Sequence, residues 1–301
     1  MIMVKRMNIL IACDQNYIEP MKTMLYSLRC NTNGAIDVYL LYNRISEDNI
    51  QRFSTWLKEN CSIQLKPIFV EESLFQNAPQ KKWWSVETYF RLMVCSLLPI
   101  EIDRILWLDA DIIVNRGIDD FYEQSFDENY AVVCKGCNQS LKKNLDLPSS
   151  YVYFNAGVIL FNLKKLRSIF SQDLVFSYID TYHDRLKALD QDILNIMFIG
   201  HVKYANELIY NHEIYGGYVT AHKQMVILRN QTAIIHFTGP IKPWNPEGAN
   251  WADSFWWKYE RKRGRAKEWL VYRILNLPMK LYYNFRELYF FVFAQMRKIL
   301  Q

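Results

Sequence analysis

The stretch RILWLDADIIV, residues 104–114, places two aspartates one residue apart within an otherwise apolar run. We expect a buried strand over 103–108, with Asp109 and Asp111 where it ends. Extended residues i and i+2 point to the same side, so both carboxylates can converge on one ligand. Because unpaired buried carboxylates are costly, a proton, a cation or a metal must neutralise them. Oxygen ligands at this spacing suit Mg²⁺ or Mn²⁺ bound together with phosphates.

Strands and helices alternate along the chain before this stretch. The predicted strands are 8–13, 37–43 and 62–70, and the predicted helices are 18–29, one that begins after the capping residue Ser46, and 85–98. Further strands are expected near 130–134, 157–162, 201–204 and 233–237, with helices near 163–182 and 190–199. Apolar strands in such alternation predict a mostly parallel α/β sheet flanked by helices. Ligands bind at the carboxyl ends of strands in this kind of sheet.

The aspartate pair alone has other interpretations. A solvated turn after a strand has the same composition. An EF-hand loop needs an oxygen ligand and then a glycine at positions that Ile113 and Val114 occupy here, which excludes it. A phosphatase of the haloacid dehalogenase type also has D-x-D after an apolar strand, but usually on its first strand. That phosphatase stays the alternative.

Three further segments carry polar residues at the ends of predicted elements. ACDQNY (12–17) joins an acid, an amide and an aromatic ring, a set suited to a nucleoside but also common in turns. YFNAGVILFN (153–162) sets an amide and small residues at a strand entry, where a ligand can approach the backbone. DQDILN (190–195) is typical of a helix N-terminus, where aspartate is a common cap.

HFTGPIKPW (236–244) is more specific. His236 ends an apolar strand, Gly239 and Pro240 predict a turn, and Lys242 could neutralise a phosphate. A histidine at a strand end is more often structural than functional. Beside the aspartate pair, however, His236 becomes a candidate third metal ligand, and an imidazole in the set favours Mn²⁺ over Mg²⁺.

Composition indicates an ordinary globular protein. The 301 residues are 50% hydrophobic and 22% charged. No apolar stretch approaches the roughly 20 residues that span a bilayer, and the start of the sequence lacks the pattern of a secretory signal. The cysteines lie mostly in apolar contexts, as free thiols do in a reducing cytoplasm. We interpret Cys134-x-x-Cys137 as plain thiols at a strand end rather than half a zinc site.

Charge is distributed unevenly. Residues 258–301 hold 11 Lys/Arg against 3 Asp/Glu, whereas the rest of the chain holds 25 against 28. This aromatic, basic tail is typical of a segment in a membrane interface, with a helix packed on the body as the alternative. Nucleic-acid binding is not expected, because the body is slightly acidic. The composition shift near 250 predicts two parts, 1–250 and 251–301.

Together and in this order, the segments resemble glycosyltransferase family 8, which includes bacterial lipopolysaccharide galactosyl- and glucosyltransferases and glycogenin. The matching pieces are ACDQNY, ETYFRL, DRILWLDADIIV, YFNAGVILFNLKK, DQDILN and HFTGPIKPW, within residues 8–245. The resemblance implies a GT-A fold and transfer of a hexose from a UDP-sugar, with retention at the anomeric carbon and with a divalent metal, usually Mn²⁺. A glycan or lipid-linked glycan would be the acceptor, and a tail docked on the inner leaflet would place a cytoplasmic enzyme close to a lipid-linked one.

The resemblance also implies roles for individual residues. The metal ligands would be Asp109, Asp111 and His236. Asp14, Asn16 and Tyr17 would hold the uridine, and Gly239 and Lys242 would contact the diphosphate. The donor sugar would be surrounded by Arg91, Asn155, Asp190 and Gln191, with Ala12, Ala110, Ala156 and Gly157 completing the donor site. Gln15 stands where many relatives carry a second acid.

The catalytic residues expected from the resemblance are Asp190, Gln191 and Asp192. Gln191 would lie nearest the anomeric face, and an amide is a poor nucleophile. We therefore favour front-face substitution assisted by the leaving group, with Asp192 as the nearby carboxylate candidate. A metal-dependent phosphatase and a non-catalytic sugar-nucleotide-binding protein remain as competing functions. The residues do not separate UDP-galactose from UDP-glucose.

Overall fold

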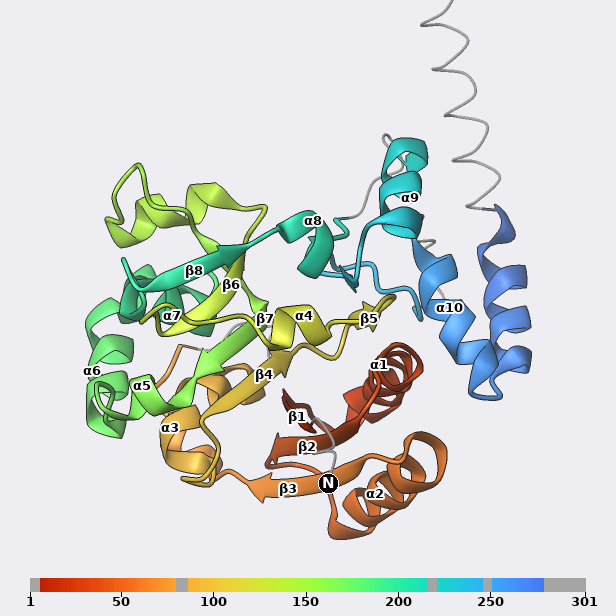
Figure 1. Ribbon diagram of the computed structural model, residues 1–301, viewed down its shortest axis with the longest axis horizontal. Helices are drawn as coiled ribbons and strands as arrows, with labels where there is room; N and C mark the ends of the chain where they lie inside the picture. The colour runs from red at the N-terminus through yellow and green to blue at the C-terminus, as the bar shows by residue number, and fades with distance from the viewer. Residues whose placement is uncertain (1–5, 80–85, 216–220, 246–250, 279–301) are drawn as a thin grey trace, which may run out of the picture.

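The computed structural model describes residues 6–79, 86–215, 221–245 and 251–278. Its main sheet has seven strands in the order β3-β2-β1-β4-β7-β6-β8, with helices on both faces (Figure 1). The strands are β1 (Arg6–Ala12), β2 (Ala35–Tyr42), β3 (Gln64–Phe69), β4 (Arg104–Leu108), β6 (Ala131–Lys135), β7 (Phe154–Asn162) and β8 (Val202–Ala205). The expected strands of the first half are all present, and the mostly parallel α/β fold is confirmed.

The order of the strands indicates where a ligand would bind. Strands β1, β2, β3 and β4 are parallel, β7 runs antiparallel to both β4 and β6, and β8 is parallel to β6. The chain adds β2 and β3 on one side of β1 and then returns to place β4 on the other. Strand order reverses between β1 and β4, and ligands bind at such a switch point, beyond the carboxyl ends of the strands. Residues 13–17 and 109–111 lie there.

Two of the expected helices differ from the prediction. The segment 85–98 contains a 3₁₀ stretch, Val86–Met93, followed by the short α3 (Val94–Leu97). The segment 163–182 is two helices, α5 (Leu163–Arg167) and α6 (Gln172–Tyr182). The break occurs because Ser171 is extended and its hydroxyl accepts a hydrogen bond from Leu174 N, which begins a new helix.

Three of the other helices were predicted from the sequence pattern, and the rest lie in segments that connect or follow the strands. α1 (Ile18–Asn31) and α2 (Glu47–Cys61) follow β1 and β2, and Ser46 caps α2 as expected. α7 (Asp190–Met197) begins at the predicted residue. The remaining helices are α4 (Asp119–Tyr122), α8 (Glu207–Tyr210), α9 (Ala221–Asn230) and α10 (Asp253–Lys262).

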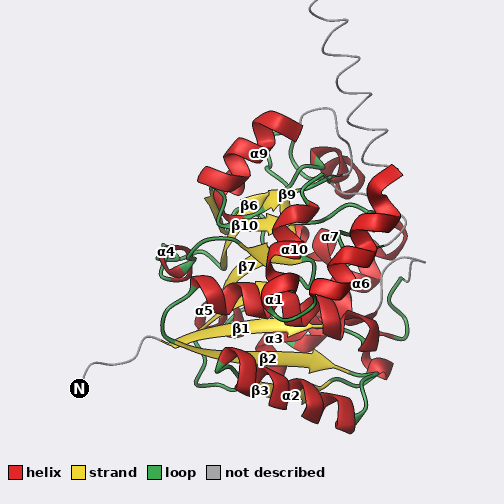
Figure 2. Ribbon diagram, turned by 90° about the vertical axis from the view of Figure 1, so that its right-hand side faces the viewer, coloured by secondary structure: helices red, strands yellow, loops and turns green. Residues whose placement is uncertain are grey.

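A small sheet, with strand order β5-β10-β9, lies beside the main one. It consists of β5 (Ile112–Val114), β9 (His212–Glu213) and β10 (Ile234–His236). β5 and β9 were not predicted, because strands of three and two residues are too short for a periodic pattern. α10 packs against this sheet and α1, and the helical residues 266–278 pack against α10, where the Tyr272 ring lies on that of Trp257 (Figure 2).

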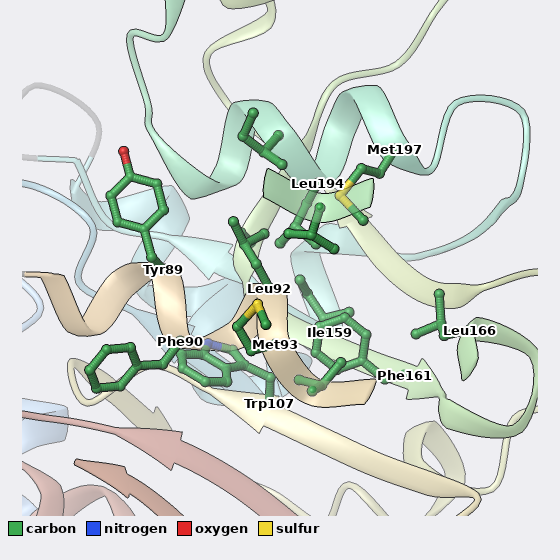
Figure 3. Packing of buried hydrophobic residues seen from close by; sticks show 14 of the residues in the cluster. Tyr89, Phe90, Leu92, Met93, Trp107, Ile159, Phe161, Leu166, Leu194 and Met197 are labelled. Carbon is green, nitrogen blue, oxygen red and sulfur yellow. The ribbon is translucent and has the colours of Figure 1, made fainter. Parts of the chain in front are cut away.

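The apolar side chains divide between the faces of the main sheet. One cluster joins it to α3, α5, α6 and α7, and another joins it to α1 and α2. In the first, Trp107 of β4 and Ile159 of β7 lie with Leu194 of α7 (Figure 3). Both faces of the sheet are buried, because its strands are apolar at consecutive positions. The polar residues that follow β1 and β4 therefore lie at the carboxyl ends of these strands.

Candidate active site

Asp109, Asp111 and His236 meet at the end of β4. The two aspartates lie in the turn from β4 to β5, and β10 pairs with β5 so that His236 is opposite Ile112. His236 Nε2 lies 3.1 Å from Asp111 Oδ1 and 3.7 Å from Asp109 Oδ2. One potential ligand atom from each residue lies within 4.8 Å of the others. Strand pairing thus brings together the three residues predicted as metal ligands.

This cluster fits a divalent metal. Asp111 Oδ1 is buried and, within the described residues, lacks a partner in hydrogen-bond geometry, which leaves it open to a cation. Gly157 of β7 faces the same space, and a Cβ there would lie 2.1 Å from His236 Cε1 and 2.8 Å from Asp109 Oδ2. A side chain at this position would fill the space between the ligands. Two carboxylates with one imidazole suit Mn²⁺.

Lys242 balances the charge of the cluster. Its ammonium donates to Asp111 Oδ2 and to the carbonyl of Phe237, each at 2.6 Å. Burial alone would raise the pKa of Asp111, but Lys242 and His236 outweigh it and hold that pKa below its usual range. Conversely, burial would lower the pKa of Lys242 and of His236, and Asp111 raises both. The aspartate therefore stays ionised and the lysine stays charged.

Arg91 joins the cluster to the start of α7. Its Nη1 donates to Asp109 Oδ1 at 3.1 Å and to the carbonyl of Ala156 at 2.5 Å, and its Nε lies 2.8 Å from Asp190 Oδ2. The guanidinium lies over the Trp107 ring, 4.3 Å from its centroid, and Trp107 Nε1 donates to Asp109 Oδ1 at 2.7 Å. Asp109 is thereby fixed in orientation, with Oδ2 directed at His236.

Asp190 is a buried acid next to this cation. Burial raises its pKa to about 7; Arg91 opposes the shift and Asp109 adds to it. Leu189, immediately before it, has φ 49° and ψ −116°, a conformation that non-glycine residues rarely adopt. Such strain costs about 1–3 kcal/mol and concentrates at functional sites.

The predicted uridine-binding residues lie in the turn after β1, the strand next to β4. Asp14 caps the short 3₁₀ helix Gln15–Tyr17, because its Oδ1 accepts from Asn16 N at 2.8 Å and Tyr17 N at 3.2 Å. The Tyr17 ring meets Trp244 edge-on, with centroids 6.1 Å apart. Gln15 turns away and accepts from Asn49 of α2 at 2.9 Å. The uridine contacts themselves stay a prediction.

Gln191 and Asp192 are held by hydrogen bonds within the protein. Gln191 Oε1 accepts from Ala156 N at 2.9 Å, and its Nε2 donates to Tyr153 Oη at 3.2 Å. Asp192 accepts from Tyr153 Oη at 2.5 Å and from two backbone N–H groups, Lys187 at 2.6 Å and Ala188 at 2.7 Å. The side chain of Asp192 is almost completely buried. It caps the turn before α7, and its catalytic role stays a prediction.

The other predicted donor residues follow or end the strands β1, β4 and β10. Ala12 is the last residue of β1, and Ala110 is buried between the two aspartates. Gly239 is buried in the turn after β10, where its N–H donates to the carbonyl of Ile214 at 3.4 Å. Cys134 and Cys137 are free thiols at the end of β6, one buried and one exposed.

Three polar residues near the cluster were missed from the sequence. Asn211 Oδ1 lies 2.9 Å from His236 Nδ1, and Asn211 Nδ2 donates to Asn155 Oδ1 at 2.9 Å. Glu213 accepts from Asn155 Nδ2 at 3.3 Å. Tyr153 orients both Gln191 and Asp192. No local signal marks Asn211 and Glu213, because β9 is only two residues long and its place beside β10 comes from tertiary structure.

Comparisons with known proteins agree with this geometry. The sequence profile of Glycosyl transferase family 8 matches residues 8–248. A lipopolysaccharide 1,3-galactosyltransferase of Salmonella typhimurium is 26% identical over 81% of this chain and 74% of its own length. A lipopolysaccharide 1,2-glucosyltransferase of Escherichia coli is 27% identical over 80% of this chain and 74% of its own.

A solved structure of the galactosyltransferase LgtC, in complex with donor and acceptor sugar analogs, superposes with a TM-score of 0.74 at 25% identity. The superposition covers 85% of this chain and 96% of that one, and the shared fold is GT-A. The site, the profile match over most of the chain and these relatives lead to one assignment. The chain belongs to glycosyl transferase family 8.

Proposed function

We propose that the protein transfers a hexose, galactose or glucose, from a UDP-sugar to a hydroxyl of a glycan or glycolipid acceptor, with retention and with Mn²⁺. The observation that carries this proposal is the convergence of Asp109, Asp111 and His236 opposite the Asp14 turn. The relatives that act on lipopolysaccharide and the neighbour solved with sugar analogs support it. They do not favour a phosphatase of the haloacid dehalogenase type.

Asp109, Asp111 and His236 would hold the metal, which supplies positive charge beside the departing diphosphate. Lys242 lies on the same side and can direct its ammonium to a phosphate oxygen in place of Asp111. Arg91 fixes the orientation of Asp109. The neutralising groups are in place before the reaction, which is how an enzyme stabilises a charged leaving group without reorganisation.

Retention by front-face substitution is consistent with the side chains around α7. A double displacement needs a free carboxylate close to the anomeric carbon. Asp192 instead accepts three hydrogen bonds from the protein, and Gln191 presents an amide held at both ends. We therefore infer that the acceptor attacks on the face from which UDP leaves, with Gln191 positioning the sugar.

The decisive experiment measures UDP release from UDP-galactose and UDP-glucose with and without Mn²⁺. We expect Mn²⁺-stimulated release in the wild type and none in Asp111→Asn or His236→Ala. Asp173→Asn, an exposed aspartate in the first turn of α6, is the matched control and should keep full activity. Mn²⁺-dependent turnover in both site variants would refute the metal assignment. UDP binding without turnover would indicate a binding protein, and phosphate release from phosphomonoesters would indicate the phosphatase.

We also propose that the C-terminal segment holds the enzyme on the anionic inner leaflet, at the cytoplasmic face. In the helical residues 266–278, Tyr272 and Asn276 face the body, whereas Leu270, Val271 and Ile274 are each more than half exposed. Lys267 and Arg273 on this helix are exposed as well. Apolar and basic side chains on one exposed helix suit an anionic lipid surface. Residues 279–301, most of the predicted tail, lie outside the described residues.

No helix within the described parts of the chain is long and apolar enough to cross a membrane. The membrane proposal is tested by co-sedimentation with vesicles of anionic and of neutral lipid. We expect the wild type to bind anionic vesicles, and the double variant Leu270→Ser/Ile274→Ser to bind less, without loss of UDP release in solution. Equal binding of both proteins, or none by the wild type, would contradict it.

A further inference from the structure

Glu213 is a carboxylate close to the metal cluster that the proposed reaction does not use. It is the last residue of β9, and in the parallel pairing of β9 with β10 it lies next to His236. Residues paired in this way project to the same side of a sheet. Glu213 and His236 therefore face the same space, although Glu213 does not belong to the cluster of candidate ligands.

Three donors converge on the Glu213 carboxylate. Cys137 N donates to Oε1 at 2.7 Å, and Cys137 Sγ and Asn155 Nδ2 lie 3.2 and 3.3 Å from Oε2. An ionised carboxylate only accepts hydrogen bonds. The amide of Asn155 must then turn its nitrogen towards Glu213 and its oxygen away.

That orientation is passed on through two amides. Asn155 Oδ1 accepts from Gly157 N at 2.8 Å and from Asn211 Nδ2 at 2.9 Å, which occupies both of its lone pairs. Because Asn211 donates with its nitrogen, its oxygen faces His236 Nδ1 at 2.9 Å. Asn211 and His236 are both buried. The oxygen requires a proton on Nδ1, so the neutral imidazole, which is the form that binds a metal, has its lone pair on Nε2, facing Asp109 and Asp111.

We propose that Glu213 is a positioning residue that sets, through Asn155 and Asn211, the tautomer of His236 that can bind a divalent metal. The proposal rests on the metal site in the proposed function and adds the group that orients it. A partner on the second ring nitrogen is a general requirement of metal-binding histidines, and its loss typically weakens metal affinity 10–100-fold. Here the direction of the hydrogen bonds is set at Asn155, where the Glu213 carboxylate accepts from Nδ2 and the Gly157 N–H donates to Oδ1.

The variant Glu213→Gln tests whether the carboxylate sets the orientation of the two amides, because glutamine has nearly the same shape as glutamate. Cys137 N and Asn155 Nδ2 bond to different oxygens of Glu213, and the glutamine amide places an NH₂ group where one of those oxygens stood, so one donor loses its acceptor. We expect Asn155 to flip and the bond from His236 to Asn211 to be lost, with Mn²⁺ affinity about tenfold weaker or more. Mn²⁺ binding is titrated without substrate, and thermal unfolding is followed in parallel. Cys137→Ser, which keeps both donors to Glu213, is the matched control and should bind Mn²⁺ like the wild type.

Nuclear magnetic resonance gives a readout that a purely structural role would not move. With diamagnetic Zn²⁺ bound, His236 of the wild type should show a slowly exchanging Nδ1 proton, which Glu213→Gln should lose while the remaining spectrum is kept. Asn211→Asp in the Glu213→Gln background places a carboxylate against Nδ1, whichever way Asn155 turns. We expect this second change to restore most of the Mn²⁺ affinity.

The outcomes separate this inference from the proposed function. Wild-type Mn²⁺ affinity and an unchanged His236 proton in Glu213→Gln would overturn the role of Glu213 and leave the transferase proposal standing. Weakened binding without rescue by Asn211→Asp would also overturn it, because the effect would not pass through Asn211. If the wild type bound no Mn²⁺ at all, the metal site and this inference would both fail.

Discussion

Gly157→Ala adds one methyl group, in the space between the metal ligands. The new Cβ would lie 2.1 Å from His236 Cε1 and 2.8 Å from Asp109 Oδ2. Carbon atoms not bonded to each other rest about 3.5–4.0 Å apart, so the imidazole would have to move by at least about 1.4 Å. Gly157 does not have a positive φ, so alanine fits its backbone and the effect comes from this contact alone.

A displacement of that size is incompatible with metal binding. Ligand distances in a metal site tolerate deviations of about 0.2 Å. Loss of His236 as a ligand should weaken Mn²⁺ binding at least about 100-fold, or about 2.8 kcal/mol. The fold should survive, because overpacking costs about 1–3 kcal/mol. The expected signature is therefore a folded protein that no longer binds Mn²⁺.

The assay is a calorimetric Mn²⁺ titration of wild type and variant at one temperature, with thermal unfolding and circular dichroism as checks of the fold. Gly117→Ala is the matched control, because its Cβ would meet the carbonyl of Asn31 at 3.3 Å, away from the cluster. It should bind Mn²⁺ normally. A folded Gly157→Ala protein with wild-type Mn²⁺ affinity would show that the metal does not sit among these three residues.

Three further predictions follow from the contacts of single side chains. Asp192→Ala should lower the free energy of unfolding by about 2–4 kcal/mol in denaturant titrations, because the buried Tyr153 hydroxyl and two backbone N–H groups lose their acceptor; unchanged stability would contradict its role as a cap. Arg167→Ala should cost a similar amount, and Arg167→Lys should not rescue it, because the guanidinium donates to five carbonyl groups between Cys95 and Ile102. The pKa of Asp190 is near 3.8 in the unfolded chain and about 7 in the folded protein. The protonated carboxyl therefore contributes its full stability below about pH 3.8, and this contribution is lost as pH rises to about 7. The stability of the wild type relative to Asp190→Asn should therefore fall across that window, and a flat difference in melting temperature would contradict the raised pKa.

The local part of the structure could be predicted from the sequence. Apolar strands, the cap at Ser46 and the position of Asp109 and Asp111 after β4 depend on residues close together in the chain, which periodicity and capping detect. The helix predicted over 163–182 was wrong as one element, because the break at Ser171 depends on a single hydroxyl within an otherwise apolar pattern. The family resemblance added His236, which spacing alone could only nominate.

The sequence by itself thus determined the α/β class, the aspartate pair and the candidate residues for a sugar-nucleotide site. Only the tertiary structure decided how that set is arranged. Pairing of β10 with β5 places His236 beside the aspartates. β7 passes close to these ligands, and Gly157 has no side chain to fill the space between them. Pairing of β9 with β10 places Asn211 and Glu213 near the His236 imidazole. These contacts join residues far apart in the chain through strands of two or three residues. Strands so short leave no periodic pattern, so their pairing is fixed by packing and hydrogen bonds that form only in the folded protein.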